Sequence, residues 1–239
     1  RNKKSMTLDL KSDSGRDIFY RMAAQADVVV ENMRPGVKHR LQVDYERLKG
    51  INPRLVYASI SGFGQDGPYA ERPCLDQIAQ GMGGHMMVTG EPGSGPMRSG
   101  AAISDMTAGI LCANGIMLAL YERERSGEGQ WVQTSLLEAM IFLLDFQAAR
   151  WLVGREIPPQ AGNHHPSIAP MGAFRTSDSF INIAPMPEMW PRFCEVMGLD
   201  ALPDDTRFAS FDNRYDNRPA LVEAIEKVTT TQTSTHWIE

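Results

Sequence analysis

Apolar positions near the start of the chain switch between helical and strand spacing. Through residues 15–26 they recur every three or four residues, which predicts a helix, and residues 27–31 then form a short apolar run that predicts a buried strand. The order repeats, with a second helix predicted between Asp44 and Gly50 and a second strand over residues 55–60. Helix-to-strand units in succession predict a parallel sheet covered by helices.

The longest helical pattern runs from Asp105 to Arg125. The apolar residues that share one face of this pattern are Ile110, Ala113, Met117 and Leu120. We expect a central buried helix that turns this face toward the core. Residues 130–135 then alternate as a strand does, and helical spacing resumes over residues 136–153. Together these elements predict a Rossmann-like α/β domain with a parallel sheet.

A proline-rich stretch follows, with Gly162 and two adjacent histidines inside it. Such a composition is typical of a linker or of a loop over a site. We therefore divide the chain into part of a large domain (residues 1–155), a linker or active-site loop (156–166) and a smaller α+β domain (167–239). The smaller domain has one predicted strand, at 180–184, and two predicted helices, at 188–197 and 219–228.

The charge balance argues against several classes of partner. Lys and Arg total 24 against 29 Asp and Glu, a formal net charge of −5, so no overall basic field attracts nucleic acid or anionic lipid. The most apolar run, Ile110–Tyr121, contains Asn114 and Gly115 and is shorter than the roughly 18 residues that a membrane helix needs. We expect no nucleic-acid partner and no membrane span.

Cysteine and histidine usage points away from disulfides and metals. The three cysteines are far apart and lie outside any Cys-x-x-Cys pattern, and the five histidines have no zinc-type spacing to cysteine or carboxylate partners. The basic residues at the start lead into Leu8-Asp9-Leu10 rather than into an apolar signal core. We expect no metal site and a reducing, cytoplasmic location.

Asp105 stands among small and apolar residues at the start of the longest helical pattern. A carboxylate at that place can cap the helix and complement its dipole. The same carboxylate, close to small residues such as Gly100 that let a substrate approach, can act as a nucleophile on an activated acyl group. The two roles are compatible, and the spacing does not separate them.

Two loops after predicted strands are candidate ligand sites. Residues 32–36 and 61–69 are rich in Gly and Pro, and ligands of open α/β sheets bind at the carboxyl ends of the strands. Segment 61–68 lacks the Gly-x-Gly-x-x-Gly spacing of a dinucleotide fingerprint, so we interpret it as a tight substrate loop. Basic residues gather nearby in sequence, at Lys3, Lys4, Lys11, Arg34, Lys38, His39 and Arg40. They form a solvated face or, if the fold brings them together, a phosphate pocket beside Asn32.

Several long motifs, in the same order, resemble the class III CoA-transferases, the CaiB/BaiF family that includes formyl-CoA transferase. The motifs are Leu8-Asp9-Leu10-Lys11, residues 27–36, 52–57 and 61–69, the segment around Asp105, and the stretches 122–123, 126–130 and 207–208. The resemblance covers nearly the whole chain and implies a large Rossmann-like domain, a small domain, and two chains interlocked as rings in a homodimer. The family's segments before Arg1 and after Glu239 are missing, so we expect an incomplete fold and a piece of a longer protein.

The resemblance also implies roles for individual residues. The family's nucleophilic aspartate corresponds to Asp105, and its contacts to coenzyme A (CoA) correspond to Leu8, Lys11, Asn32, Met33 and Arg40. The mobile loop over the active site corresponds to residues 162–166, with Asn163 and His164 where formyl-CoA transferase has glycines. The implied substrates are an acyl-CoA and a carboxylic acid, and no metal is implied.

The implied reaction moves CoA from an acyl-CoA to a free acid through a covalent aspartyl intermediate. A racemase of the 2-methylacyl-CoA type would share the fold and the CoA site but needs a second base, which is a His before an Asp in the family's racemases. Here that pair is Leu75-Asp76, and leucine cannot accept a proton, so we rank transfer above racemisation. A third hypothesis is a non-catalytic fragment that binds CoA.

Overall fold

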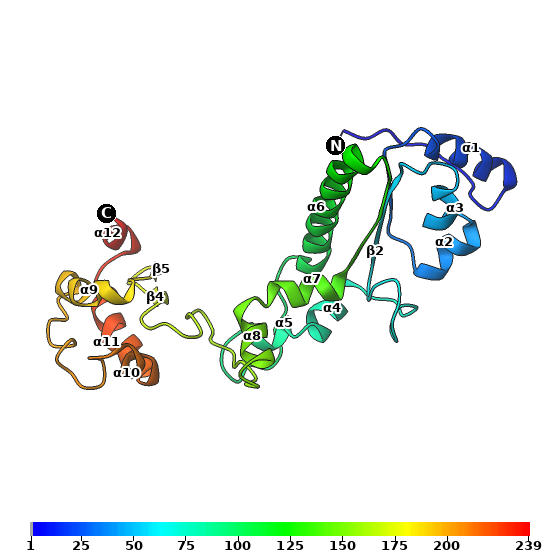
Figure 1. Cartoon of the computed structure of the whole chain (residues 1–239). Helices are drawn as coiled ribbons and strands as arrows, with labels where there is room; N and C mark the ends of the chain where they lie inside the picture. The colour runs from blue at the N-terminus through cyan, green and yellow to red at the C-terminus, as the bar shows by residue number, and fades with distance from the viewer. Residues whose placement is uncertain (1) are drawn as a thin grey trace. The chain divides into compact units, whose positions relative to one another are not determined.

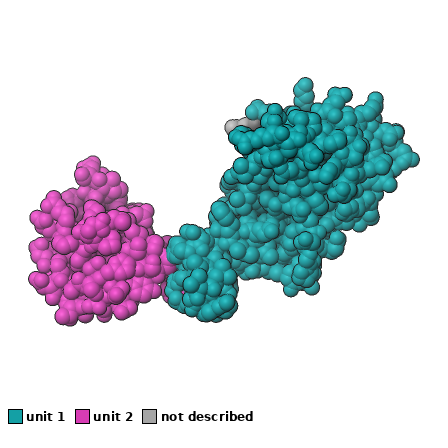
Figure 2. Space-filling model, in the orientation of Figure 1, with its two compact units in different colours: residues 1–87, 96–158 teal, residues 88–95, 159–239 magenta. Residues whose placement is uncertain are grey.

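The computed structural model describes residues 2–239 and divides into two compact units. Unit 1 runs to residue 87 and resumes over residues 96–158, and unit 2 comprises residues 88–95 and 159–239 (Figure 2). The short segment 88–95 thus groups with unit 2 although it precedes the longest helix of unit 1 in the chain. Each unit has buried hydrophobic residues of its own.

Unit 1 is built on a three-stranded parallel sheet, which confirms the predicted sheet. Its strands β1 (Val28–Glu31), β2 (Val56–Ser61) and β3 (Trp131–Ser135) lie side by side in that order. Val30 pairs with Ala58, and Ser59 pairs with Gln133. Because the strands are parallel, all three end at the same edge of the sheet, and the loops that follow them meet there.

Helices cover both faces of this sheet (Figure 1). On one face lie α1 (Asp13–Ala23), α2 (Pro35–Leu41) and α3 (Tyr45–Lys49), and on the other lie α4 (Asp76–Met82), α6 (Ile103–Ser126) and α7 (Leu136–Leu143). Successive side chains of a strand point to opposite faces, so β2 serves both layers. Tyr57 packs with Leu48 of α3, and Ile60 packs against the cluster that contains Ala108 of α6.

The buried face of α6 differs from the predicted one. Ile110 and Met117 are 66% and 67% exposed, whereas the apolar and hydroxyl residues that are buried are small, namely Ser104, Ala108, Cys112 and Ala119. A Cβ at Gly115 would come within 2.7 Å of Val132 Cγ1. The prediction is wrong because α6 lies so close to β3 that only small side chains fit between them, and the large apolar ones remain on the outer face.

Within residues 2–239, α6 is also the one helix long and apolar enough to cross a membrane. It has 24 residues, and an 18-residue window within it has a mean hydropathy of 1.5 with 22% of the window buried. A search for an uninterrupted apolar run does not detect this helix, because Asn114 and Gly115 interrupt the run. They do not lower the mean hydropathy of the window enough to exclude the helix. A single such helix is a weak indication of a membrane span, since the core helix of a soluble protein passes the same test.

The single helix predicted over residues 136–153 is two helices. α7 ends at Leu143, and α8 (Phe146–Leu152) begins after Asp145, whose φ is 47°. Residues with a side chain rarely adopt a positive φ, and a helix cannot continue through it. The chain therefore turns at a point where the hydrophobic spacing continues. A further short helix, α5 (His85–Val88), follows α4.

Unit 2 is a small α+β domain, as predicted. β4 (Gly172–Arg175) and β5 (Phe180–Ile183) form an antiparallel pair. They are followed by a 3-10 turn, η1 (Pro187–Met189), and by the helices α9 (Trp190–Met197), α10 (Phe211–Asp216), α11 (Arg218–Thr229) and α12 (Ser234–Ile238). Phe174, Trp190 and Ile225 belong to its buried core.

Candidate functional site

The segments that follow the three parallel strands line an open cavity of about 870 Å³ in unit 1. Its wall comprises Asn32–Pro35 after β1, Ile60–Gly62 at the end of β2, Arg72–Leu75 before α4, and Asp105 and Leu136 at the starts of α6 and α7. Both strand-end loops that the sequence marked as candidate sites therefore contribute to one cavity, and Asp105 lies in the same wall.

Asp105 lies in the first turn of α6 and is exposed at this cavity. The residue at the cap position is Ala102, so the expectation that Asp105 caps the helix is wrong, whereas its place in the first turn does let it complement the helix dipole. Partial burial, and next the negative charge of Asp76, raise the pKa of the Asp105 carboxyl above its ordinary value. A carboxylate with a raised pKa and an open approach is suited to nucleophilic attack.

Cys74 is another potential nucleophile in the cavity wall. Burial, and next the charge of Asp105, raise the pKa of its thiol above the ordinary value. The thiol therefore stays protonated at neutral pH, and a protonated thiol is a poor nucleophile. Its Cβ packs so closely on Gly62 that a side chain at that position would overlap it. Of the two groups, Asp105 is the better candidate for covalent chemistry.

Asp76, whose negative charge acts on Asp105, is buried and fully engaged. Ser104 donates to its Oδ1 from the backbone N (3.0 Å) and from Oγ (2.9 Å). Gln80 Nε2 donates to its Oδ2 at 2.7 Å, and Arg98 Nη2 lies 3.4 Å from the same oxygen. The preceding residue, Leu75, lines the cavity. The place where a racemase of this family has its His-Asp pair therefore offers an apolar side chain and an engaged carboxylate.

The loop after β1 is fixed by a buried ion pair. Lys38 Nζ of α2 lies 2.8 Å from Glu31 Oε1, and the two side chains are 1% and 5% exposed. The backbone N of Met33 donates to Glu31 Oε2 at 2.7 Å, and Asn32 Nδ2 donates to the carbonyl of Ile60 at 3.1 Å. Two residues predicted to contact CoA, Asn32 and Met33, are thus held at the cavity wall.

Lys38 is not part of a phosphate pocket, which corrects one interpretation of the basic cluster. Its ammonium also donates to Ser59 Oγ (3.2 Å) and to Gln65, and it lies 5.1 Å from the centre of the Trp131 ring. Because Lys38 is fully buried, it cannot reach a ligand phosphate. It instead ties β1, β2 and the loop after β2 together.

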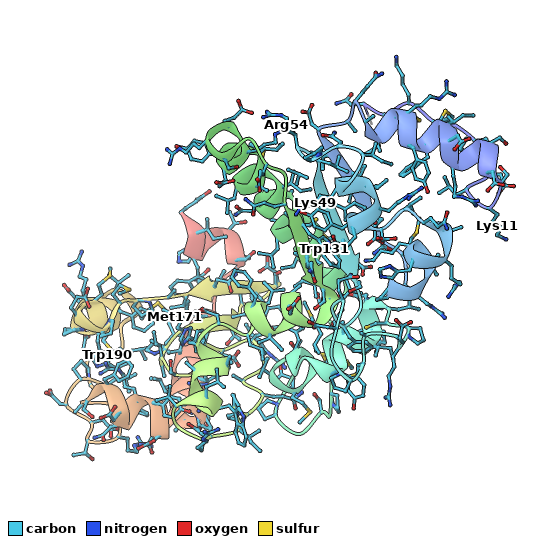
Figure 3. All side chains as sticks on the ribbon, turned by 45° about the vertical axis from the view of Figure 1, so that its right-hand side comes forward. Lys11, Lys49, Arg54, Trp131, Met171 and Trp190 are labelled. Carbon is cyan, nitrogen blue, oxygen red and sulfur yellow. The ribbon has the colours of Figure 1, made fainter. Side chains whose placement is uncertain are left out.

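Three other predicted CoA contacts lie outside the cavity wall. Leu8 and Lys11 precede α1, and Lys11 is exposed, with its backbone N donating to Asp9 Oδ1 at 2.9 Å. Figure 3 shows Lys11 next to α1, apart from Trp131 of β3. Arg40 is exposed in the last turn of α2. Their contact with CoA stays a prediction.

The loop at residues 162–166 belongs to unit 2, where backbone hydrogen bonds hold it. Gly162 N donates to the carbonyl of Gly90 (2.9 Å), and His165 N donates to that of Met171 (2.8 Å). His164 forms an antiparallel bridge with Gly172, so the loop extends the edge of β4. Its role over an active site stays a prediction.

No pattern in the sequence marked residues 72–74, which supply three residues of the cavity wall, and Leu75 was named only as the place of a racemase base. Arg72 brings a cation, whose guanidinium carbon lies 4.2 Å from the centre of the Tyr69 ring. The available signal was Pro73, which ends the Gly-rich loop directly before α4. Proline closes loops of many kinds, so this signal alone could not mark a cavity wall.

The fold and the cavity together define an α/β protein whose strand ends surround a reachable carboxylate, joined to a small α+β domain. Within residues 2–239, no three His, Cys, Asp or Glu side chains gather as a metal ion would require. The model of CoA-transferase family III matches residues 1–239, and the chain belongs to this family.

Similar proteins agree with that assignment. The chain is 40% identical to an acetyl-CoA:oxalate CoA-transferase of Acetobacter aceti, over 100% of this chain and 62% of that protein. It is 38% identical to a succinate–glutarate CoA-transferase of Agrobacterium fabrum, over 96% of this chain and 58% of that protein. The solved structure of a CaiB/BaiF family protein from Brucella suis superposes on this chain with a TM-score of 0.84 at 39% identity. The match covers 100% of this chain and 63% of that protein. The chain thus spans less than two thirds of the length of these relatives.

Proposed function

We propose that the complete protein transfers CoA from an acyl-CoA to a free carboxylic acid, with Asp105 as the covalent nucleophile. The observation that carries the proposal is the position of Asp105, an exposed carboxylate of raised pKa in the wall of the strand-end cavity. Membership of CoA-transferase family III and the names of the relatives, which pair acetyl-CoA with oxalate and succinate with glutarate, support the reaction class. By that analogy the proposed acceptor is a dicarboxylic acid.

The reaction needs only the carboxylate and the two substrates. An oxygen of Asp105 attacks the thioester carbon, and the carbon–sulfur bond breaks to give a mixed anhydride and CoA thiolate. The thiolate attacks the aspartyl carbon, which releases the donor acid and leaves Asp105 as a CoA thioester. The acceptor carboxylate attacks that thioester, and the freed thiolate then attacks the acceptor carbon of the new anhydride. Asp105 returns as a carboxylate, with no net gain or loss of protons or electrons.

The proposed CoA contacts fall into two groups. Asn32 and Met33 stand in the cavity wall and would hold the CoA chain near Asp105. Lys11 and Arg40 are exposed cations and would bind phosphate groups, a role that suits ammonium and guanidinium donors. Leu8 would contribute apolar contact, and residues 162–166 would cover the site.

We extend the proposal to an interlocked homodimer in the cytoplasm. Support for the dimer comes from the outer face of α6, where five large side chains are between 61% and 67% exposed, namely Met106, Ile110, Met117, Leu118 and Tyr121. An apolar patch of this kind marks a surface that another element covers. Since the chain spans 62% of the Acetobacter aceti relative, the rest of the protein and a second copy are both available to cover it.

Transfer is favoured over racemisation because Asp76 is engaged in hydrogen bonds and Leu75 cannot accept a proton. Deuterium uptake at Cα distinguishes the two reactions. The complete protein is incubated in heavy water with a chiral 2-methylacyl-CoA and no acceptor acid. Transfer predicts no deuterium at Cα, and uptake of deuterium at Cα would contradict the ranking.

The transferase proposal is tested by CoA exchange in the complete protein. Acetyl-CoA or succinyl-CoA is incubated with isotopically labelled oxalate or glutarate, and labelled acyl-CoA is measured. Asp105→Ala is expected to lower exchange by on the order of 10⁴-fold with CoA binding retained. Asp17→Ala, which removes an exposed carboxylate of α1, is the matched control and should leave exchange unchanged. Exchange retained in Asp105→Ala would refute the proposal, and CoA binding without exchange of any acid would favour a non-catalytic protein.

A further inference from the structure

The start of α6 has no capping side chain of its own. The cap residue is Ala102, and the first backbone N–H groups of a helix have no partner within the helix. A cap side chain would bond to the N–H of the second or third helical residue. Here the N–H of Ser104, the second residue, donates instead to Asp76 Oδ1 at 3.0 Å, and its hydroxyl donates to the same oxygen at 2.9 Å. Asp76 of α4 therefore caps α6 from a neighbouring helix.

Gln80, one turn further along α4, extends this connection. Its Nε2 donates to Asp76 Oδ2 at 2.7 Å, and its Oε1 accepts the backbone N–H of Ser99 at 2.8 Å. Arg98 Nη2 lies 3.4 Å from the same Asp76 oxygen. Asp76, Gln80 and Ser104 are all buried, so water does not compete for the bonds among these three residues. The Ala101 carbonyl also accepts from Gln80 Nε2 at 3.4 Å, so the stretch 98–104, which leads into the first turn of α6, is bonded to α4 at four residues.

We propose that Asp76 is a positioning residue, which fixes the first turn of α6 through Ser104 and so holds the carboxylate of Asp105 at the cavity wall. The proposal rests on the proposed function of Asp105. Asp105 follows Ser104 directly, and the first turn of a helix frays when its N–H groups lack partners. A displacement of about 1 Å at a reacting group can cost on the order of 10²-fold in rate.

Asp76 also acts on Asp105 through its charge. Asp105 shares the cavity wall with three other titratable or charged groups, Arg34, Arg72 and Cys74 before α4, and the charge of Asp76 on α4 acts on it. Arg98 pairs with Asp76, and the charge of Asp76 also reaches His85. Among these groups, the negative charge of Asp76 raises the pKa of Asp105. A neutral residue at position 76 would therefore shift the acid limb of the rate profile to lower pH, because Asp105 must be ionised to attack.

The test is Asp76→Asn in the complete protein, with kcat and KM for the acyl-CoA measured against pH. The Asn oxygen could still accept from Ser104, but its NH2 would then face the donors Gln80 Nε2 and Arg98 Nη2, which displaces the side chain from the start of α6. We expect kcat to fall by on the order of 10²-fold with KM unchanged, and the acid limb of kcat to move to lower pH. Asp76→Glu keeps the charge with a longer side chain, so kcat should fall less and the acid limb should stay in place. Gln77→Ala, an exposed change on the same helix, is the control and should alter neither quantity.

Amide hydrogen exchange supplies a readout that does not depend on activity. Residues 103–107 should exchange faster in Asp76→Asn than in Gln77→Ala, with the rest of α6 unchanged. Wild-type kcat and an unmoved acid limb in Asp76→Asn would overturn the proposal. If Asp76→Asn does not fold, Ser104→Ala and Asp76→Glu decide it, and wild-type kcat in both would overturn it. Failure of the unsubstituted protein to exchange CoA would instead refute the proposed function of Asp105.

Discussion

Replacing Lys38 with Met is expected to destabilise unit 1 and to loosen the cavity wall. The four-carbon stem of Lys38 packs in the layer between α2 and the sheet, and Met fills a similar volume. What Lys38→Met removes is the ammonium, which pairs with Glu31 at 2.8 Å, donates to Ser59 and Gln65, and faces the Trp131 ring. The Glu31 carboxylate, 5% exposed, would remain buried without its cation.

The expected cost is about 3–5 kcal/mol, the usual range when one partner of a buried ion pair is removed. A second substitution, Glu31→Gln, neutralises the stranded charge while its side-chain oxygen can still accept the backbone N–H of Met33. The double variant should therefore be more stable than Lys38→Met alone. Since Met33 and Gln65 belong to the two loops near the cavity, KM for the acyl-CoA should also rise in Lys38→Met.

The assay is denaturant unfolding of the complete protein, with hydrogen exchange of β2 as a local readout for unit 1. Lys38→Arg is a control that keeps the charge. A loss of less than about 1 kcal/mol in Lys38→Met would mean that water reaches the ion pair, as for surface pairs. A double variant no more stable than the single one would show that the stranded charge is not the cause of the loss. Either result would refute the electrostatic reasoning.

Three further predictions concern packing and pH. Gly115→Ala should destabilise unit 1 by about 1–3 kcal/mol, because the new Cβ would approach β3 to 2.7 Å. Gly109→Ala, which has open space at its Cβ, should instead stabilise unit 1 by up to about 1 kcal/mol, because Ala has the higher helix propensity. Thermal unfolding of the two variants measures the difference. Arg123→Lys should lower the unfolding free energy by about 1–3 kcal/mol, since a single ammonium cannot reproduce the bond of Nη1 to the Arg54 carbonyl (3.1 Å) together with the ion pair at Nη2. Burial raises the pKa of the Cys194 thiol to about 11. The folded state therefore holds the thiol proton more tightly than the unfolded state does. The stability that this proton contributes is present below pH about 8.5 and is lost as pH rises toward 11. Cys194→Ala should weaken that alkaline loss, as measured by unfolding of unit 2 against pH.

The sequence predicted the strands of the sheet well because their apolar runs are local, although β1 is less buried than expected, with Val30 56% exposed. Residues 27–31 and 55–60 are apolar runs bounded by polar and turn residues, and both form parallel strands. The face of α6 was predicted wrongly because periodicity assumes that large apolar residues are buried. Contact with β3 instead selects small residues such as Gly115 and Ala108, and hydrophobicity alone does not report how close two elements lie.

The candidate site was predicted in part for a similar reason. The rule that ligands bind at strand ends marked the loops after β1 and β2, and both line the cavity with Asp105. Lys38 was predicted to lie on a solvated face or in a phosphate pocket, because a Lys among basic neighbours favours a surface position. Only the fold reveals that Lys38 is buried against Glu31. The link from Asp76 to Ser104 spans 28 residues, so no local pattern could have indicated it.

The central claim is that Asp105 forms a covalent bond to the substrate, and peptide mapping tests it most directly. The complete protein is incubated with an acyl-CoA donor, treated with hydroxylamine to trap activated carboxyl groups, digested and analysed by mass spectrometry. A hydroxamate is expected on Asp105, formed only when the donor is present, and none is expected on Asp76. Turnover of the donor with Asp105 unmodified, or with the trapped group on another residue, would contradict that claim.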